Sequence, residues 1–319
     1  MRKGRVVLAL ASLVVAAAAI AAVAGVASNS AKAAPKKTLT FYLIPGIATD
    51  AFYTTMHKGA AAEAAKVGVK LVFQGSPTAF SAPTQIPYLN AAIARHPSAI
   101  LIAPIKKAIS AGIPVATVDT FITKPIAFTN ISSDNIAGGK AAADALATAI
   151  GKSGKVAAIS VQPGISTTDQ RKQGFETELK KYPNIQYLGT QFDNDDQTKA
   201  SQEMSALLTA HSDIKGVFAM NVVSGNGVTA AVKAAGKSGV VKLVEFDAEP
   251  NQVQALKAGT IDALIAQDPF DIGKMGVDLA LKWVKGQRSG IKKHYGTGSA
   301  IITKSNVNSP SIKKFLYTK

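Results

Sequence analysis

The chain has 319 residues, 47% of them hydrophobic, which is enough to bury the cores of one large or two ordinary domains. Cysteine is absent, which excludes disulfides, thiolate metal sites, a catalytic thiol and a lipid-modified cysteine. The net charge is +16, but the lysines are scattered, with no arginine-rich run and no aromatic ladder between basic residues. We therefore expect a solvated basic surface and no nucleic-acid partner.

The first 33 residues have the pattern of a secretory signal peptide. A basic start is followed by an almost wholly small and apolar stretch, 6–27, and then by Ala31-Lys32-Ala33, which fits an A-x-A cleavage site. An uncleaved membrane anchor is the alternative, since a run of this length could span a bilayer. Because weakly apolar alanine dominates the run, we favour cleavage and export to the periplasm or cell envelope, without a lipid anchor.

From residue 38 onward, apolar runs of strand length alternate with helical patterns. The predicted strands are 39–44, 69–73, 99–103, 115–118, 156–161, 185–188, 216–220, 241–246 and 263–266. The predicted helices are 51–67, 135–150, 167–181, 197–211, 227–237, 249–258 and 271–285. Most of the apolar runs are continuous, which is typical of strands buried on both faces of a parallel sheet. Asp134 and Asp196 stand where helix N-caps belong.

This alternation predicts an α/β fold with doubly wound parallel sheets. Two sheets of about six strands are more plausible than one sheet of eleven or twelve, so we expect two lobes with a ligand cleft between them. One connection is unusually short. Only 104–114 separates the strands 99–103 and 115–118, whereas a parallel crossover normally takes a dozen residues or more. We expect a helix of about two turns at 105–111. The shortening either lies mostly outside the ligand pocket and is tolerated, or removes part of the rim of the cleft in the first lobe and weakens binding.

Polar and aromatic side chains follow the predicted strands at their carboxyl ends, where open parallel sheets bind ligands. The main candidates are Asp50, Phe52, Tyr53, Asp119, Arg171, Asn221, Asp247 and Gln267. Carboxylates and amides exchange paired hydrogen bonds with vicinal hydroxyls, and aromatic rings cover the C–H face of a sugar. The set therefore predicts a polyhydroxylated ligand. Each residue alone has a plainer interpretation: the two aromatics could be core, Asn221 could satisfy a turn and Asp247 could cap a helix.

Several stretches resemble one family of binding proteins. They are DAFYTTMHKGAAAEAAKVGVKL, IPVATVDT, ISSDNIAGGKAAADALA, QRKQGFETEL, LLTAHSDIKGVFAMN and VEFDAEPNQVQALKAGTIDALIAQDPFDIGKMG, and they cover nearly all of 38–319. The chain resembles the periplasmic binding proteins of the ribose-binding type, which are the substrate-binding components of sugar ABC importers. The SDN-x-x-GG stretch, together with the FD and AQ pairs near the end, is fairly specific for this family.

The resemblance implies two similar lobes, 38–133 plus 268–296 and 134–267 plus 297–319, joined by three crossing segments. It implies a sugar or polyol held in the cleft, closure of the hinge around it, and an ABC importer permease that reads the closed form. It implies a monomer, with no catalysis, no cofactor and no metal. All eight candidate residues named above match sugar contacts of the family.

Three positions depart from the ribose-binding pattern. Thr120 stands where ribose binders place an arginine, Val222 where an acid is common, and Asp195 or one of its neighbours where ribose binders place an aromatic ring. These departures suggest a sugar other than ribose, a polyol or a similar small polar ligand.

Other classes of protein find less support in the sequence. The four histidines have no metal-ligand spacing, and no H-E-x-x-H or G-x-S-x-G motif occurs, so a secreted carbohydrate-active enzyme is the weaker alternative. A sugar-responsive regulator would need a helix-turn-helix where the signal peptide stands. A receptor for chemotaxis or signalling without import stays open, since it would use the same closing cleft.

Overall fold

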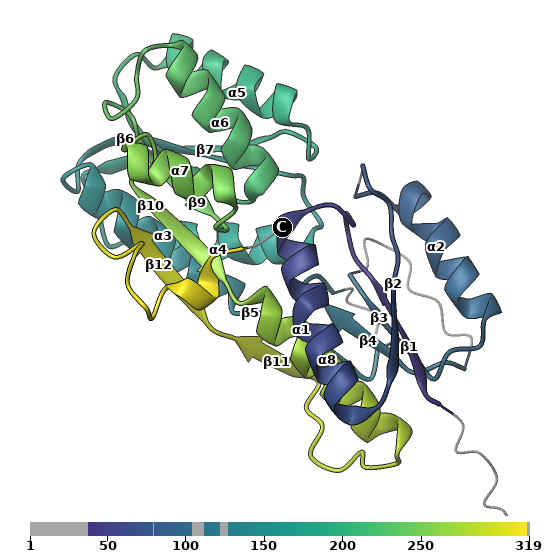
Figure 1. Cartoon of the computed structure of the whole chain (residues 1–319). Helices are drawn as coiled ribbons and strands as arrows, with labels where there is room; N and C mark the ends of the chain where they lie inside the picture. Colours follow the sequence, from purple (N-terminus) through teal and green to yellow (C-terminus); the bar gives the residue numbers. More distant parts are fainter. Residues whose placement is uncertain (1–37, 79, 104–111, 122–126, 318–319) are drawn as a thin grey trace, which may run out of the picture. The chain divides into compact units, whose positions relative to one another are not determined.

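The computed structural model describes residues 38–78, 80–103, 112–121 and 127–317, and within these ranges twelve strands form two sheets of six (Figure 1). The predicted signal peptide and the predicted helix 105–111 lie outside the described residues. None of the described helices is long and apolar enough to cross a membrane.

The first sheet is wholly parallel and has the strand order β11-β5-β4-β3-β1-β2. Its strands are β1 (Thr40–Ile44), β2 (Lys70–Phe73), β3 (Ala99–Ile102), β4 (Val115–Val118), β5 (Thr129–Ser133) and β11 (His294–Thr297). β3 and β4 pair in parallel, so the short connection noted in the sequence is a true crossover. Its path from 104 to 111 lies outside the described residues.

The second sheet has the order β12-β10-β9-β8-β6-β7, with only the edge strand β12 antiparallel. Its strands are β6 (Gly154–Ser160), β7 (Ile185–Phe192), β8 (Ile214–Ala219), β9 (Lys242–Phe246), β10 (Ala263–Gln267) and β12 (Ser299–Thr303). The inner strands β8, β9 and β10 are almost entirely buried, as their continuous apolar runs predict.

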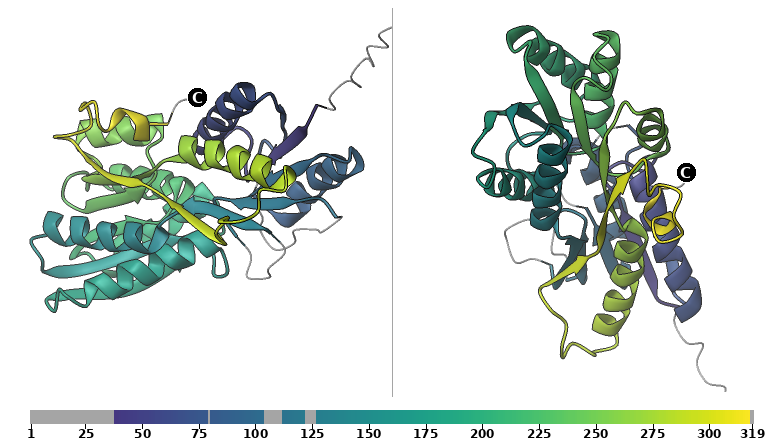
Figure 2. Two further views of the ribbon diagram at one scale, coloured as in Figure 1. Left: turned by 90° about the horizontal axis from the view of Figure 1, so that it is seen from below. Right: turned by 90° about the vertical axis from the view of Figure 1, so that its left-hand side faces the viewer.

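Helices cover both faces of each sheet. Around the first sheet these are α1 (Ala51–Val67), α2 (Ala82–Ala94) and α8 (Pro269–Val284), and around the second α3 (Asn135–Ala149), α4 (Ser166–Leu179), α5 (Gln197–Ala210), α6 (Val222–Ala234) and α7 (Pro250–Ala258). α1 and α8 lie side by side on one face of the first sheet, and α2 packs on the other (Figure 2). In the second sheet, α3 and α4 cover one face and α5, α6 and α7 the other.

Glycines allow two helix pairs to approach closely. A Cβ added at Gly59 or Gly273 would lie 2.0 Å from a backbone oxygen of the partner helix, so α1 and α8 touch backbone to backbone. α3 and α4 repeat this arrangement, since a Cβ at Gly139 would lie 2.0 Å from the Arg171 oxygen and one at Gly174 would lie 2.1 Å from the Ile136 oxygen. These contacts fix where the first turns of α1 and α4 stand.

The chain passes between the sheets three times: between β5 and α3, between β10 and α8, and between β11 and β12. Three connections between two doubly wound sheets are the architecture that the sequence predicts. The residue numbers at which one lobe ends and the next begins stay a prediction.

Candidate ligand-binding site

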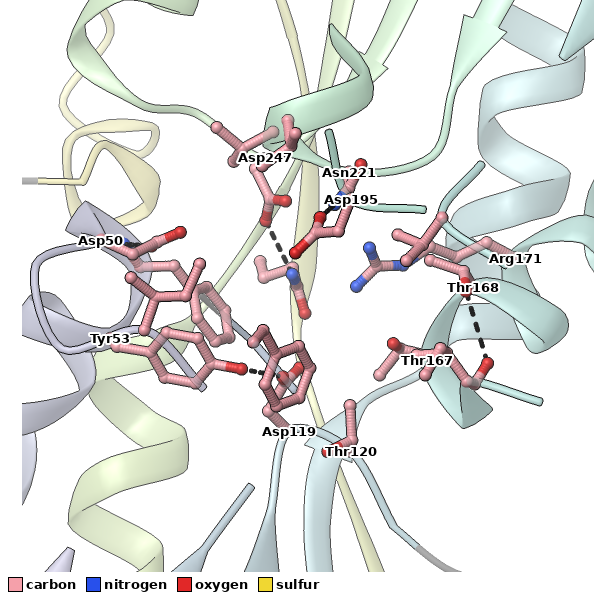
Figure 3. A pocket seen from close by; sticks show the side chains of 18 residues that line it. Asp50, Tyr53, Asp119, Thr120, Thr167, Thr168, Arg171, Asp195, Asn221 and Asp247 are labelled. Carbon is pink, nitrogen blue, oxygen red and sulfur yellow. Dashed lines mark hydrogen bonds between the residues drawn. The ribbon is translucent and has the colours of Figure 1, made fainter. Parts of the chain in front are cut away.

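A cavity of about 600 Å³, counting the solvent at its mouth, lies between the carboxyl ends of the two sheets (Figure 3). All eight candidates from the sequence line it: Asp50, Phe52, Tyr53, Asp119, Arg171, Asn221, Asp247 and Gln267. The structure thus brings together residues up to 217 positions apart, although their contact with a ligand stays a prediction. The N-cap aspartate Asp134 is different, because its carboxylate accepts the N–H of Ala137 and it does not line the cavity.

Asp119 and Asp247 occupy equivalent places in the two sheets. Each follows an inner strand, β4 or β9, with a positive φ of 66° and 81° respectively. This left-handed conformation is strained for most residues but tolerated by aspartate, and it turns each side chain into the cavity (Figure 3). Each carboxylate accepts a tyrosine hydroxyl, from Tyr53 at 2.8 Å and from Tyr317 at 2.9 Å. The sequence interpretation of Asp247 as a helix cap is wrong, since Glu249 is the N-cap of α7.

Arg171 comes from the second turn of α4 and is 3% exposed. Its Nε donates to Asn135 Oδ1 at 2.9 Å and its Nη1 to the Met220 oxygen at 2.7 Å, while its guanidinium stacks on the Phe246 ring at 3.7 Å. Burial lowers the pKa of Arg171, and the charges of Asp247 and Asp119 oppose that shift. The guanidinium points into the cavity as a rigid, charged donor (Figure 3).

Asn221 and Asp195 form a third polar wall. Asn221 caps α6 by accepting the Ser224 N–H at 3.0 Å, and its amide nitrogen donates to Asp195 at 2.8 Å. Behind them, the fully buried Asp193 accepts the Asp195 N–H at 2.8 Å and the Ser224 hydroxyl. The network fixes Asp195 toward the cavity, and burial raises its pKa. The turn interpretation of Asn221 therefore describes its backbone contact, and its side chain also reaches the cavity.

Two acids of the cavity, Asp50 and Asp119, hold their protons unusually well. Burial, together with the charges of Glu249 and Asp247, raises the pKa of Asp50 to about 8. Burial raises the pKa of Asp119 to about 6, although Arg171 and the Tyr53 hydroxyl pull it down. Four carboxylates against one guanidinium give the cavity an excess of hydrogen-bond acceptors. Among the described residues, no group of three His, Asp or Glu side chains could hold a metal ion.

Some lining residues were absent from the sequence-based set. Phe80, whose ring lies 6.5 Å from that of Tyr53, comes from the segment before α2, a helix that the sequence patterns did not reveal. Thr167 and Thr168 begin α4 and add hydroxyls beside Arg171. Asp195 was noted only as a departure from the ribose pattern.

The model of the periplasmic binding protein domain matches residues 41–288 of this chain. The chain belongs to the periplasmic binding proteins. This periplasmic binding protein is 34% identical over 271 residues to the ribose import binding protein RbsB of Salmonella typhimurium, covering 82% of this chain and 90% of that protein. Its relatives are thus named as binding proteins, not as enzymes.

Solved structures confirm the predicted fold of this periplasmic binding protein. An ABC transporter solute binding protein from Agrobacterium vitis, bound with alpha-D-tagatopyranose, is 46% identical with a TM-score of 0.85, covering 88% of this chain and all of that one. A carbohydrate transporter solute binding protein from Agrobacterium radiobacter, in complex with D-arabinose, is 29% identical with a TM-score of 0.82, covering 88% of this chain and 99% of that one.

Proposed function

We propose that the protein is the solute receptor of a sugar ABC importer, which captures a monosaccharide in the cavity between its sheets and delivers it to the importer permease. The observation that carries this proposal is the lining of the cavity. Four carboxyl groups, two amides and an arginine converge there beside Phe52, Tyr53 and Phe80. Acceptors and donors at several angles around apolar rings suit a sugar, which has hydroxyls at its edge and C–H bonds on its faces.

Two carboxylate oxygens, one of Asp119 and one of Asp247, support the same proposal. Within the described residues, Tyr53 donates to Oδ2 of Asp119, whereas Tyr317 and Gln267 both donate to Oδ1 of Asp247. The other oxygen of each carboxylate receives no hydrogen bond from that part of the chain. Each acid is therefore held through one atom and offers another to a pair of sugar hydroxyls.

We favour a hexose in its six-membered ring form over ribose. Thr120 and Asp195 line the cavity where ribose binders are expected to place an arginine and an aromatic ring. Relative to that pattern, the cavity has one cation and one aromatic ring fewer and one acid more. The similarity to a solute binding protein bound with alpha-D-tagatopyranose supports this choice of ring.

The proposal also covers where the receptor acts, its oligomeric state and its role in import. The signal pattern at residues 1–33 supports export to the periplasm or envelope, and the receptor acts as a monomer without catalysis. Import is favoured over signalling because the relatives it resembles are named as import or transporter proteins.

A thermal-shift screen of pentoses, hexoses, polyols and amino acids tests the proposal, since a ligand that binds only the folded form raises its apparent stability. We expect the largest shift with a hexose. A shift with an amino acid, and none with any sugar or polyol, would contradict the assignment.

A further inference from the structure

Two hydrogen bonds join the halves of the molecule through groups that do not line the cavity. The Ala51 N–H, at the start of α1, donates to Oε1 of Glu249, in front of α7, at 3.1 Å. The Phe121 N–H, just beyond β4, donates to the hydroxyl of Ser166, the first residue of α4, at 2.9 Å. Each bond therefore runs from a segment of the first sheet to one of the second.

The two bonds stand on different sides of the ligand cavity. Asp50 and Thr167 are the sequence neighbours of Ala51 and Ser166, and they lie on opposite sides of the cavity (Figure 3). Between them stand the carboxylates and the arginine that face the ligand. A pair of bonds so placed bridges the opening at two separate points.

Glu249 is held ready for its contact by the second half of the molecule. Its own N–H donates to Oε1 of Gln252 at 3.0 Å, and the amide nitrogen of Gln252 donates to Glu245 at 3.1 Å and to the Phe246 oxygen at 2.9 Å. The backbone of Glu249 is thus held in place by residues of the second half of the molecule.

The Ala51 N–H, which donates to Glu249, lies at the N-terminus of a helix and favours an anionic acceptor. The first N–H groups of a helix have no acceptor inside that helix, and the N-terminus favours negative charge. The Asp50 side chain accepts the N–H of the next residue, Phe52, at 2.7 Å. The start of α1 is therefore capped by one acid from each half of the molecule.

We infer that Glu249 and Ser166 are positioning residues that latch the two lobes together over the bound ligand, an inference that rests on the proposed function. Both bonds require the lobes to be closed. When the lobes part, water can satisfy the Ala51 and Phe121 N–H groups, but in the closed form the contact at Ala51 is buried. Loss of the Ser166 acceptor therefore weakens the closed form and leaves the open form almost unchanged, whereas loss of the Glu249 side chain also removes half of the capping box of α7.

Stopped-flow measurement of sugar release tests the latches in Glu249→Ala and Ser166→Ala. An unmade hydrogen bond at a buried N–H costs roughly 1–3 kcal/mol, so release from Glu249→Ala should be about 5- to 100-fold faster. The Ser166→Ala effect should be about 2- to 10-fold, because its bond is neutral and partly exposed. The factor should be the same for every sugar that binds, since neither side chain touches the ligand.

Three comparisons separate latching from a structural role. Glu249→Gln keeps an acceptor and should recover most of the slow release. Glu176→Gln and Ser205→Ala change side chains of α4 and α5 that interact with Lys172 and Ser201 of the same helices, and should release sugar like the wild type. The unfolding temperatures of ligand-free Ser166→Ala and Glu249→Gln should stay close to that of the wild type, whereas Glu249→Ala should lower it through loss of the α7 capping box.

The possible failures are distinct. A wild-type protein that binds no sugar would overturn the proposed function and the latches with it. Sugar binding with unchanged release from both alanine variants would overturn the latches alone. If Glu249→Ala does not fold, Ser166→Ala decides the matter: faster sugar release from it supports the latches, and release at the wild-type rate would overturn them.

Discussion

At the scale of single residues, the cavity is built from charged groups that are anchored at one atom and available at another. Asp247 illustrates this, because Tyr317 at 2.9 Å and Gln267 at 2.7 Å both donate to Oδ1. Arg171 is likewise anchored, since its Nε donates to Asn135 and its Nη1 to the Met220 oxygen. Side chains held in this way lose little conformational freedom when a ligand arrives, so more of the interaction energy is realised as affinity.

Replacement of Asp247 by asparagine should separate binding from folding. Asparagine tolerates the positive φ of 81° and still offers one oxygen to Tyr317 and Gln267, but it turns the free oxygen into an N–H donor. We expect sugar affinity to fall about 10- to 100-fold, as for loss of a hydrogen bond to a charged group. Titration calorimetry measures the change, with the exposed Asp213→Asn as control. Unchanged affinity would remove Asp247 from the site.

Asp50 should make the stability of the ligand-free protein depend on pH. Its pKa is raised from 3.8 to about 8, so the folded form binds this proton more tightly than the unfolded form does. The stabilisation from Asp50 is fully present below pH 4, is lost as the pH rises toward 8 and then stays constant. Glu249 and Asp247 raise this pKa, and the Phe52 and Tyr53 N–H groups oppose them.

Thermal unfolding of the wild type and Asp50→Asn from pH 5 to pH 9 measures this contribution, since asparagine keeps the N-cap but has no proton to exchange. The unfolding temperature of the wild type relative to the variant should fall between pH 5 and pH 8. A constant difference over this range would show that Asp50 titrates normally.

The sequence predicted much of the lining of the cavity, because parallel sheets place their carboxyl ends together and eight polar or aromatic residues stood there. Asp195 escaped because the predicted strand ended at residue 188, whereas β7 continues through polar residues to Phe192. A strand that pairs irregularly with β6 and carries few apolar side chains gives no continuous run to read. Phe80 was not predicted because it lies just before α2, a helix that the sequence patterns did not reveal since Pro87 lies in its interior.

At the scale of helices and strands, the long periodic segments were predicted well, whereas the last two strands of the chain, both at sheet edges, were not. β11 has the sequence HYGT, and β12 is a half-exposed antiparallel edge, so neither shows the apolar run of a buried strand. Their pairing with β5 and β10 is set by contacts far along the chain. α6 begins at Val222, ahead of the predicted 227, because Asn221 provides its N-cap.

The contact between α3 and α4 should control both stability and binding. A Cβ at Gly139 would lie 2.0 Å from the Arg171 oxygen, and flexible side chains cannot relieve a clash with backbone. We expect Gly139→Ala to lower the free energy of unfolding by roughly 1–3 kcal/mol or more and to weaken sugar binding by displacing Arg171. Denaturant unfolding and calorimetry measure both effects.

Gly296→Ala is the matched control, because a Cβ at Gly296 meets no atom within 4 Å and its φ is not positive. It should unfold and bind as the wild type does. If Gly139→Ala also kept wild-type stability and affinity, the close approach of α3 to α4 would not be what positions Arg171.

At the scale of the whole molecule, two similar sheets joined by three passages of the chain place one cavity between their carboxyl ends. Equivalent aspartates, Asp119 and Asp247, face each other across it from β4 and β9. Because each half contributes charged groups to the same ligand, binding favours the arrangement in which the halves are close. An importer can then distinguish a loaded receptor from an empty one by its shape.

Calorimetric titration of hexoses and pentoses into the purified protein tests the central claim most directly, namely that this cavity binds a monosaccharide. We predict that at least one hexose binds with one site per chain, more tightly than ribose, and that Asp247→Asn weakens that binding about 10- to 100-fold. The absence of binding heat with every sugar, or binding that Asp247→Asn leaves intact, would contradict the account.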